Sequence, residues 1–190
     1  MYIDKIYLGD CLELMKEIPD ESIDCIICDL PYGVLNKNNV NAQWDIIIPF
    51  EKLWAQYERI TKDNAAIILF AQGMFTAKLM MSNPKHWRYN LIWQKRGRCS
   101  GFLNAKKMPL REHEDIVVFY RKLPTYNPQM TKCEPHERNH SRGKQEKEHT
   151  NRCYGNFGKA EDIITDLQYP KSILNFKRPH PPIHPTQKPV

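Results

Sequence analysis

The sequence predicts an α/β fold in which a doubly wound, mostly parallel sheet lies between helices. Two observations predict it. Segments with apolar residues at helical spacing alternate along the chain with short apolar runs. Several of these runs are continuously apolar, which is typical of strands that are covered on both faces by helices.

The first half of the chain supplies three predicted strands and three predicted helices. Leu14 and Ile18 lie one helical turn apart, behind a short strand that ends at Gly9-Asp10. Further along, the strand "AAIILFA" follows a segment with strong helical periodicity. The predicted strands are 5–10, 23–28 and 65–71, and the predicted helices are 11–18, 50–60 and 75–81.

The second half predicts three more strands and a polar insertion. Strands are expected at 88–93, 115–120 and 171–176, and the second of these is apolar enough to be covered on both faces. Residues 124–160 contain few aliphatic and many charged side chains, so they cannot build a core of their own. We therefore expect a single domain over 1–190 that carries this insertion.

The bulk composition indicates a basic protein of a reducing compartment. A formal charge of +6 favours polyanionic partners. The six cysteines are scattered, without the dense framework of a secreted disulfide-bonded domain. The longest apolar run, residues 65–71, is far shorter than the roughly 20 residues of a membrane helix, and the start of the chain has no signal-peptide pattern. We expect a cytoplasmic protein with no membrane partner.

The stretch "DCIICDLPYG" (24–33) sends an acid and an aromatic residue out of the end of an apolar strand. Ligands of open parallel sheets bind at the carboxyl ends of strands, which is where Asp29 and Tyr32 would emerge. Taken alone, the stretch is also compatible with a plain turn, because Pro and Gly punctuate turns and Asp satisfies local backbone donors.

One reaction needs this set of groups. Methylation of an exocyclic amino group of a base requires acceptors for its N–H bonds, so that the nitrogen lone pair is released from conjugation with the ring. One carboxylate and one backbone carbonyl held by a proline can accept those bonds, and a neighbouring aromatic ring can stack on a base taken out of its duplex. No covalent enzyme intermediate is needed.

Several stretches of the chain, in a fixed order, carry a resemblance to one family. They are "GDCLELM", "DESIDCIICDLPYG", "QWD" at 43–45, "ILFAQGMFTAKLMMSN", "RYNLIWQKRGRCSGFLNAKKMPLREHEDIVVFY", "YNPQM", "YPKSILNF" and "HPTQKPV". In this order they resemble the β-class, circularly permuted DNA adenine-N6 methyltransferases, whose catalytic motif is D-P-P-Y. The resemblance implies a Rossmann-like methyltransferase fold, S-adenosyl-L-methionine as cofactor and double-stranded DNA as substrate.

The resemblance also implies roles for the four residues that follow the strand. Asp29 would accept from the target amino group, and Leu30 would supply its main-chain carbonyl. Pro31 would set the turn, and Tyr32 would stack on the flipped base. Leu30 departs from the commoner proline, but its implied role belongs to the backbone. The family also includes cytosine-N4 enzymes, which usually have serine in place of the aspartate, so Asp29 points to adenine.

The glycine-rich cofactor loop of this family has no counterpart among the eight glycines of the chain. "YGNFGKAED" is preceded by no apolar strand and is interpreted as a turn. In the β-class order that loop follows the "HPTQKP" segment, so we expect a partial domain whose sheet is incomplete at its C-terminal end. The resemblance places Asp10 at the adenine part of the cofactor, and Thr186 and Lys188 near its methionine end. Local reasoning leaves Asp10 equally compatible with a helix cap.

A basic segment between two predicted strands is the candidate DNA contact. Cations can bind phosphates, and Trp93 or Phe102 could occupy the space left by a displaced base. The candidate phosphate ligands are Lys95, Arg96, Arg98, Lys106, Lys107 and Arg111. The insertion at 124–160 is the candidate target-recognition region, because this interval commonly serves that role in the family.

Two further interpretations stay open at this level. Cys133, His136, His140, His149 and Cys153 have spacings that zinc would permit, but the tract has no CxxC pair and is generally rich in His, so we expect no metal. The chain could also be an incompetent fragment that only binds nucleic acid, or an RNA adenine-N6 or DNA cytosine-N4 enzyme. A homodimer or a complementing chain would fit a partial domain.

Overall fold

The computed structural model describes residues 4–35, 38, 40–97, 99–133, 150–151, 155–156, 166–177, 181 and 187–188. The chain forms two compact units. One comprises Met1–Thr125 together with Ser172–Val190, and the other is Tyr126–Lys171. The candidate catalytic, cofactor-binding and DNA-binding residues named above belong to the first unit, and the zinc candidates belong to the second.

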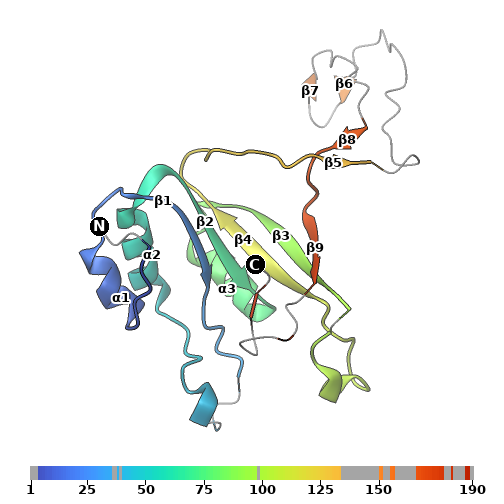
Figure 1. The fold of residues 1–190 in the computed structure, drawn as a ribbon, viewed down its shortest axis with the longest axis horizontal. Coiled ribbons are helices and arrows are strands. Elements are labelled where there is room, and N and C mark those ends of the chain that lie inside the picture. Colours follow the sequence, from blue (N-terminus) through green and yellow to red (C-terminus); the bar gives the residue numbers. More distant parts are fainter. Residues whose placement is uncertain are drawn as a thin grey trace. The chain divides into compact units, whose positions relative to one another are not determined.

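The first unit is built on a five-stranded sheet in the order β1-β2-β4-β3-β9 (Figure 1). β1 pairs in parallel with β2, and β3 pairs in parallel with β9. β4 lies between β2 and β3 and is antiparallel to both. The strands are β1 (Ile23–Asp29), β2 (Thr61–Ala71), β3 (Trp87–Arg96), β4 (His113–Phe119) and β9 (Ile173–Lys177).

The α/β class is confirmed, but the sheet is mixed and not mostly parallel. Sequence patterns do not distinguish a parallel from an antiparallel neighbour when both are buried, and only the pairing shows that β4 runs against β2 and β3. The antiparallel placement brings the start of β4 next to the ends of β2 and β3. The carboxyl ends of β1, β2 and β3 and the amino end of β4 therefore share one edge of the sheet.

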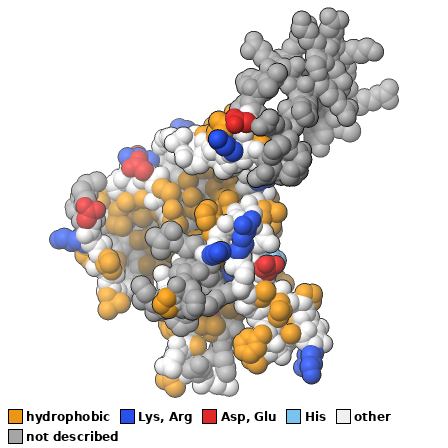
Figure 2. All heavy atoms as spheres, turned by 45° about the vertical axis from the view of Figure 1, so that its right-hand side comes forward, with side chains coloured by type: hydrophobic (Ala, Val, Ile, Leu, Met, Phe, Trp, Pro, Cys, Tyr) orange, Lys and Arg blue, Asp and Glu red, His pale blue; other side chains and the backbone are white. Residues whose placement is uncertain are grey.

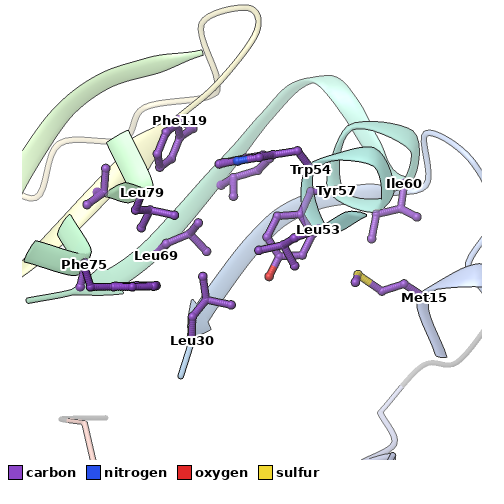
Figure 3. Packing of buried hydrophobic residues seen from close by; sticks show 13 residues of the cluster. Met15, Leu30, Leu53, Trp54, Tyr57, Ile60, Leu69, Phe75, Leu79 and Phe119 are labelled. Atoms are coloured by element: carbon purple, nitrogen blue, oxygen red, sulfur yellow. The ribbon is translucent and has the colours of Figure 1, made fainter. Parts of the chain in front are cut away.

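The helices α1 (Cys11–Leu14), α2 (Phe50–Ile60) and α3 (Met74–Ser82) contribute to one apolar cluster. Leu53 and Tyr57 of α2 and Leu79 of α3 pack with Leu69 of β2 and Phe119 of β4 (Figure 3). Because all three helices share this core, the second helical layer expected of a doubly wound sheet does not occur among the described residues.

Most predicted elements are confirmed, with shifted ends. α2 has the predicted bounds, and β2 and β3 extend beyond theirs. The predicted helix over 11–18 is α1 followed by a 3₁₀ turn over Met15–Glu17. The predicted strand over 5–10 is wrong, since no residue of this segment that the structure describes is in a strand. Ile6 and Leu8 are fully exposed, so within the part of the chain that the structure describes these two apolar side chains are not covered.

β1 also differs from its prediction, because only one of its faces is covered. Ile26 and Cys28 pack on the core cluster, whereas Ile27 on the other face is 68% exposed. β4 agrees with its prediction, since four of its last five residues are buried and the other, Asp115, is half-buried. A continuous apolar run is thus not enough to bury both faces of a strand at the edge of the described sheet.

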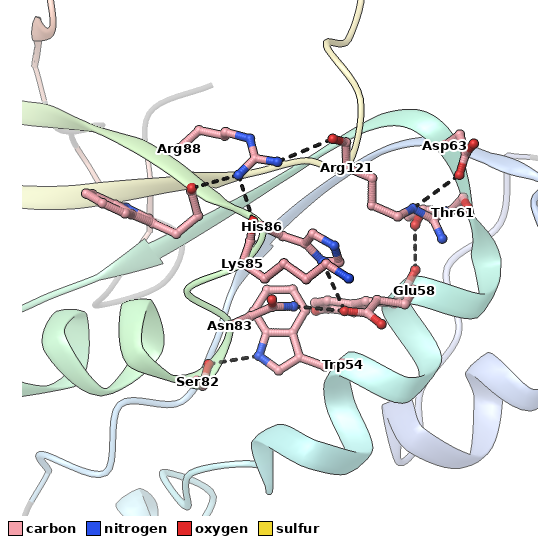
Figure 4. Close-up of polar contacts among 12 residues, drawn as sticks. Trp54, Glu58, Thr61, Asp63, Ser82, Asn83, Lys85, His86, Arg88 and Arg121 are labelled. Carbon is pink, nitrogen blue, oxygen red and sulfur yellow. Dashed lines mark hydrogen bonds and ion pairs between the residues drawn. The ribbon is translucent and has the colours of Figure 1, made fainter.

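Polar contacts join α2 to the end of α3 and to the segment between α3 and β3 (Figure 4). The Glu58 carboxylate accepts from Asn83 Nδ2 at 2.9 Å and contacts His86 Nδ1 at 3.1 Å. Trp54 Nε1 donates to Ser82 Oγ at 2.8 Å. These contacts satisfy polar groups next to the apolar core and fix the start of β3 against α2.

The second unit contains pairs of very short strands. β5 (Thr131–Lys132) pairs antiparallel with β8 (Leu167–Gln168), and β6 (Thr150–Asn151) pairs antiparallel with β7 (Gly155–Asn156). Its proposed role in target recognition stays a prediction. In the part of the chain that the structure describes, no helix has the length and apolar character required to cross a membrane.

Candidate active site

A cavity of about 720 Å³ opens at the shared edge of the sheet. Its walls come from the end of β1, the loop behind it, the end of β2, the end of β3 and the start of β4. The lining residues are Asp29, Leu30, Tyr32, Val34, Leu35, Trp44, Asp45, Gln72, Trp93, Lys95, Ser100, Glu114, Gln187 and Lys188. A cavity of this size accommodates a nucleobase or a comparable small molecule.

Asp29 and Tyr32 form the acidic and aromatic part of this cavity. The Asp29 side chain is 36% exposed, so it is neither sealed beneath its neighbours nor lost in bulk solvent. Tyr32 Oη donates to Asp29 Oδ1 at 2.9 Å. One face of the Tyr32 ring stacks on Phe75 of α3, with ring centroids 5.0 Å apart. Burial and the neighbouring carboxylates of Asp29 and Glu114 raise the pKa of the Tyr32 hydroxyl, which stays protonated and able to donate.

Leu30 is anchored by its side chain, which is 6% exposed and belongs to the core cluster. The backbone on either side of Leu30 carries Asp29 and Pro31, so burial of one leucine fixes where the site residues leave the strand. The turn itself depends on Gly33, whose φ is +68°. A Cβ at this position would lie 2.9 Å from Ile47 Cγ1, so both conformation and space require glycine.

Three charged side chains from separate segments meet beside Asp29. Glu114 at the start of β4 accepts from both Lys95 of β3 and Lys188. Lys188 Nζ also lies 3.3 Å from Asp29 Oδ1 and 3.4 Å from Tyr32 Oη. Burial acts to raise the pKa of Glu114, but the ammonium groups of Lys188 and Lys95 outweigh it and hold that pKa below its usual range. Glu114 is therefore ionised at neutral pH.

Aromatic rings surround the Lys188 ammonium group. Its Nζ lies 5.5 Å from the Tyr32 ring centroid, 5.1 Å from that of Phe70 and 5.8 Å from that of Trp93. These distances are within the range in which an aromatic face attracts a cation. With two carboxylates nearby, this part of the cavity is built to hold positive charge.

The loop behind Tyr32 is held by Asp45, which is 7% exposed. The Asp45 carboxylate accepts from the backbone N–H groups of Gly33, Val34 and Leu35 at 2.9, 2.7 and 2.7 Å. Burial acts to raise the pKa of Asp45, and these backbone donors outweigh it and lower that pKa. Asp45 thereby fixes the wall of the cavity that follows the site residues.

The Asp45→Asn variant should unfold with a free energy about 1.5–3 kcal/mol lower than that of the wild type at pH 7, because an amide cannot replace a carboxylate that accepts three backbone bonds. Urea unfolding followed by circular dichroism measures the difference. Since the folded-state pKa of Asp45 is lowered, its stabilisation is complete above the unfolded carboxyl pKa of about 4 and is lost as the pH falls below it. The gap between the two proteins should shrink there, and a gap unchanged at pH 3 would contradict this account.

The residues expected to hold a cofactor are placed unevenly. Lys188 lines the cavity beside Asp29, and Thr186 lies outside the described residues. Asp10 caps α1, since its Oδ1 accepts from the Leu12 backbone N–H at 2.8 Å. That contact agrees with the cap that local reasoning allowed, and the cofactor role of Asp10 stays a prediction. Of the zinc candidates only Cys133 is among the described residues.

The candidate DNA contacts split into two groups. Lys95 is 5% exposed and paired with Glu114, so it is placed in the cavity wall and not on an exposed phosphate-binding surface, and its predicted contact with DNA stays a prediction. Trp93 is 2% exposed and, unlike Phe102, has no free surface with which to enter a duplex in this structure. Both lie on β3, whose side chains alternate between the sheet's faces, so a basic or aromatic residue next to a surface loop can still point into the protein.

The remaining cations lie on or beside an exposed loop between β3 and β4. Arg96, Lys106 and Lys107 are exposed, and Arg98 lies outside the described residues. Arg111 pairs through its backbone with Ser100 and donates from Nη1 to Gln72 Oε1 at 2.9 Å, so it closes the base of the loop next to the cavity. Figure 2 shows apolar and cationic side chains together on the part of the molecule that this loop forms. Within the loop, Phe102 is 76% exposed.

Sequence reasoning missed Glu114 and gave no role to Asp45. "HED" at 113–115 gives no local sign of a site, since polar residues commonly begin a strand, and "QWD" is only part of a resemblance. The alternation within β4 offered one signal, because it puts Glu114 on the same face as the buried Ile116. Nothing local in the sequence indicates that two lysines, one of them 74 residues away, converge on that carboxylate.

Comparison with known proteins identifies methyltransferases as relatives of the chain. The chain is 31% identical over 122 residues to the Type II methyltransferase M.HinfI of Haemophilus influenzae, which covers 53% of this chain and 34% of the relative. It is 30% identical over 110 residues to the Type II methyltransferase M2.MboI of Moraxella bovis, covering 47% of this chain and 40% of that protein. The chain thus spans less than half the length of these two relatives.

The fold has a counterpart among solved structures. The cytosine-N4-specific PvuII DNA methyltransferase superposes with a TM-score of 0.54 at 13% sequence identity, over 92% of this chain and 57% of that one. At this identity the likeness concerns the fold alone, and it confirms the Rossmann-like arrangement. The DNA methylase family defined for N6 and N4 enzymes matches residues 23–190, which include every residue of the cavity wall named above. The chain therefore belongs to the DNA methylase family.

Proposed function

We propose that the protein is a DNA methyltransferase that transfers a methyl group from S-adenosyl-L-methionine to the N6 amino group of adenine. The observation that carries this proposal is the placement of Asp29 and Tyr32 side by side in a cavity at the carboxyl end of β1. Family membership and the Type II methyltransferase relatives support the reaction class. The choice of adenine over cytosine is supported by Asp29 at the first position of the motif.

The proposed chemistry of the chain's own residues begins with Asp29. Its carboxylate accepts an N–H of the target amino group and stabilises the positive charge that develops on the nitrogen during transfer. The Leu30 carbonyl accepts the second N–H. Both bonds draw the nitrogen lone pair out of conjugation with the ring and fix its direction. The Tyr32 ring is supported from behind by Phe75, so it offers the cavity a rigid aromatic surface for the base.

The charges of the cavity wall support a cofactor with a positive centre. Three aromatic rings and two carboxylates lie around the Lys188 ammonium group, so this wall favours positive charge next to the proposed reaction centre. S-adenosyl-L-methionine would supply an electrophilic methyl group on a sulfonium. By family resemblance, Asp10, Thr186 and Lys188 would hold it.

Radiolabelled S-adenosyl-L-methionine and the full-length protein test this proposal. Methyl transfer to double-stranded DNA, with N6-methyladenine as the labelled nucleoside, is the expected result. N4-methylcytosine as the product would overturn the choice of base, and label in RNA but not in DNA would overturn the choice of polymer. If calorimetry shows tight cofactor binding but no methyl is transferred to DNA or RNA, the protein binds the cofactor without catalysing transfer to either polymer, and the proposed reaction is overturned.

The exposed loop is proposed to bind the phosphate backbone. Replacing Lys106 and Lys107 together by Ala should weaken binding about equally for all DNA sequences. It should also reduce the slope of log affinity against log salt by about two, one for each lost phosphate contact. Fluorescence anisotropy with a labelled duplex measures both quantities.

A matched control for this loop is the double variant Lys78→Ala/Lys85→Ala. Both lysines are exposed, and Lys85 precedes β3, at the opposite end of the strand from the cavity. This variant carries the same net charge as the loop variant. Equal loss of affinity in the two would show that only the overall charge matters and would contradict a specific role of the loop.

The chain covers only part of its relatives, so the activity of the whole protein is part of the same proposal. The proposal also includes a cytoplasmic location and a role in a restriction-modification system. A homodimer or a complementing chain stays a prediction. Size-exclusion chromatography with light scattering on the full-length protein tests it.

A further inference from the structure

The group of charges beside Asp29 is organised around one carboxylate. Glu114 contacts both Lys95 and Lys188, and the side-chain exposures of the three are 11%, 7% and 16%. Taken with Asp29, the group contains two ammonium groups and two carboxylates. A charge removed from such a buried set leaves its partner without compensation, so loss of Glu114 would leave Lys95 unpaired and Asp29 as the one carboxylate beside Lys188.

The contacts of Asp29 are made through one oxygen. Tyr32 donates to Oδ1, and Lys188 Nζ lies 3.3 Å from the same atom. The closer partner of Lys188 is the Glu114 carboxylate. Among the described residues, both of these contacts engage Oδ1, so Oδ2 of Asp29 is the oxygen that remains to accept from an amino group.

This arrangement matters for the proposed reaction, on which the inference rests. An ammonium group paired fully with Asp29 would compete with the target N–H and oppose the positive charge that develops on the nitrogen. We propose that Glu114 is a positioning residue that holds Lys188 beside Oδ1, so that Asp29 remains open to the base. Lys95 is the second cation of Glu114 and fixes that carboxylate from the other side.

The Glu114→Gln variant should show this role. An amide cannot balance the charge of Lys188, which is then free to close onto Asp29. We expect kcat for methyl transfer to fall about a hundredfold at saturating cofactor, with a smaller change in KM for DNA. Glu112→Gln is the matched control, because it removes an exposed carboxylate two residues earlier and should keep wild-type kcat.

Rescue separates a positioning role from a merely structural one. Adding Lys188→Met to the Glu114→Gln variant removes the ammonium group that closes onto Asp29, so at saturating cofactor kcat of the double variant should be about tenfold higher than that of Glu114→Gln alone. Because Lys188 is also proposed to hold the cofactor, KM for S-adenosyl-L-methionine should rise in the double variant, and the comparison is therefore made on kcat. If Glu114 only stabilised the fold, the second substitution would leave the rate unchanged or lower it. In the wild type Lys188 Nζ lies 3.3 Å from Asp29 Oδ1. A crystal structure of Glu114→Gln should show Lys188 Nζ moved to within hydrogen-bond distance of Asp29 Oδ2, the oxygen that the base needs.

Loss of Glu114 also leaves Lys95 buried without a counter-charge, which could prevent folding. The same comparison is then made in the Lys95→Met/Glu114→Gln background, with and without Lys188→Met. Wild-type kcat in Glu114→Gln, or absence of rescue in a folded variant, would overturn the inference while leaving the proposed function intact. A wild-type protein that methylates no nucleic acid would overturn both.

Discussion

Replacement of Asp29 by Ala should lower the rate of methyl transfer by about a thousandfold or more, because the reaction loses the group that accepts the amino N–H and balances the charge developing on the nitrogen. The effect should fall on kcat more than on KM, since this interaction strengthens as the transition state forms. Single-turnover transfer of labelled methyl to DNA, with product release excluded, is the measurement.

Two variants sharpen this test. Asp29→Asn keeps the size of the side chain and one acceptor oxygen, so it separates the charge from the shape and should retain more activity than Asp29→Ala. Asp24→Ala removes another aspartate of β1, whose exposed side chain pairs with Lys62 at 2.7 Å on the surface. Such a pair contributes little to stability, and wild-type activity is expected. Full activity of Asp29→Ala would remove the basis of the proposed function.

The largest effect on stability is expected at Phe119. Its side chain is fully buried, and its ring centroid lies 4.8 Å from that of Trp54, so it connects the central strand β4 to α2. Phe119→Ala should lower the free energy of unfolding by about 3–5 kcal/mol, through lost transfer energy and the cavity left behind. Urea unfolding of the wild type and the variant gives the difference.

Phe102→Ala is the matched control for that change. The same side chain is removed, but Phe102 is 76% exposed, and the free energy of unfolding should stay within about 0.5 kcal/mol of wild type. Similar losses in both variants would mean that Phe102 is packed in solution or that Phe119 is not part of the core.

The elements that the sequence predicted well are those in which local spacing decides burial. Phe50 to Ile60 repeats with helical period over three turns, and α2 has the predicted bounds. The strand before Asp29 was predicted from its apolar residues, and the position of Asp29 at its end follows directly. In both cases neighbouring residues carry the whole signal.

Predictions of strands and of exposed side chains failed where burial depends on contacts with segments far apart in the chain. Among the described residues, the apolar pattern in residues 5–10 has no partner strand, and Ile27 of β1 is exposed. Lys95 belongs to a basic segment, yet the alternation of β3 turns it inward to Glu114. Charge and hydrophobicity along the chain do not report which side of a strand will be covered.

By itself the sequence determined the α/β class, the helices around the core, and the acid and aromatic residue at the end of β1, because these follow from periodicities of a few residues. The tertiary structure alone decided that β4 runs antiparallel and delivers Glu114 to the same edge, and that Lys95 and Lys188 converge there. The physical reason is that pairing direction and the balance of buried charges are properties of segments far apart in the chain, which meet only when the sheet has formed.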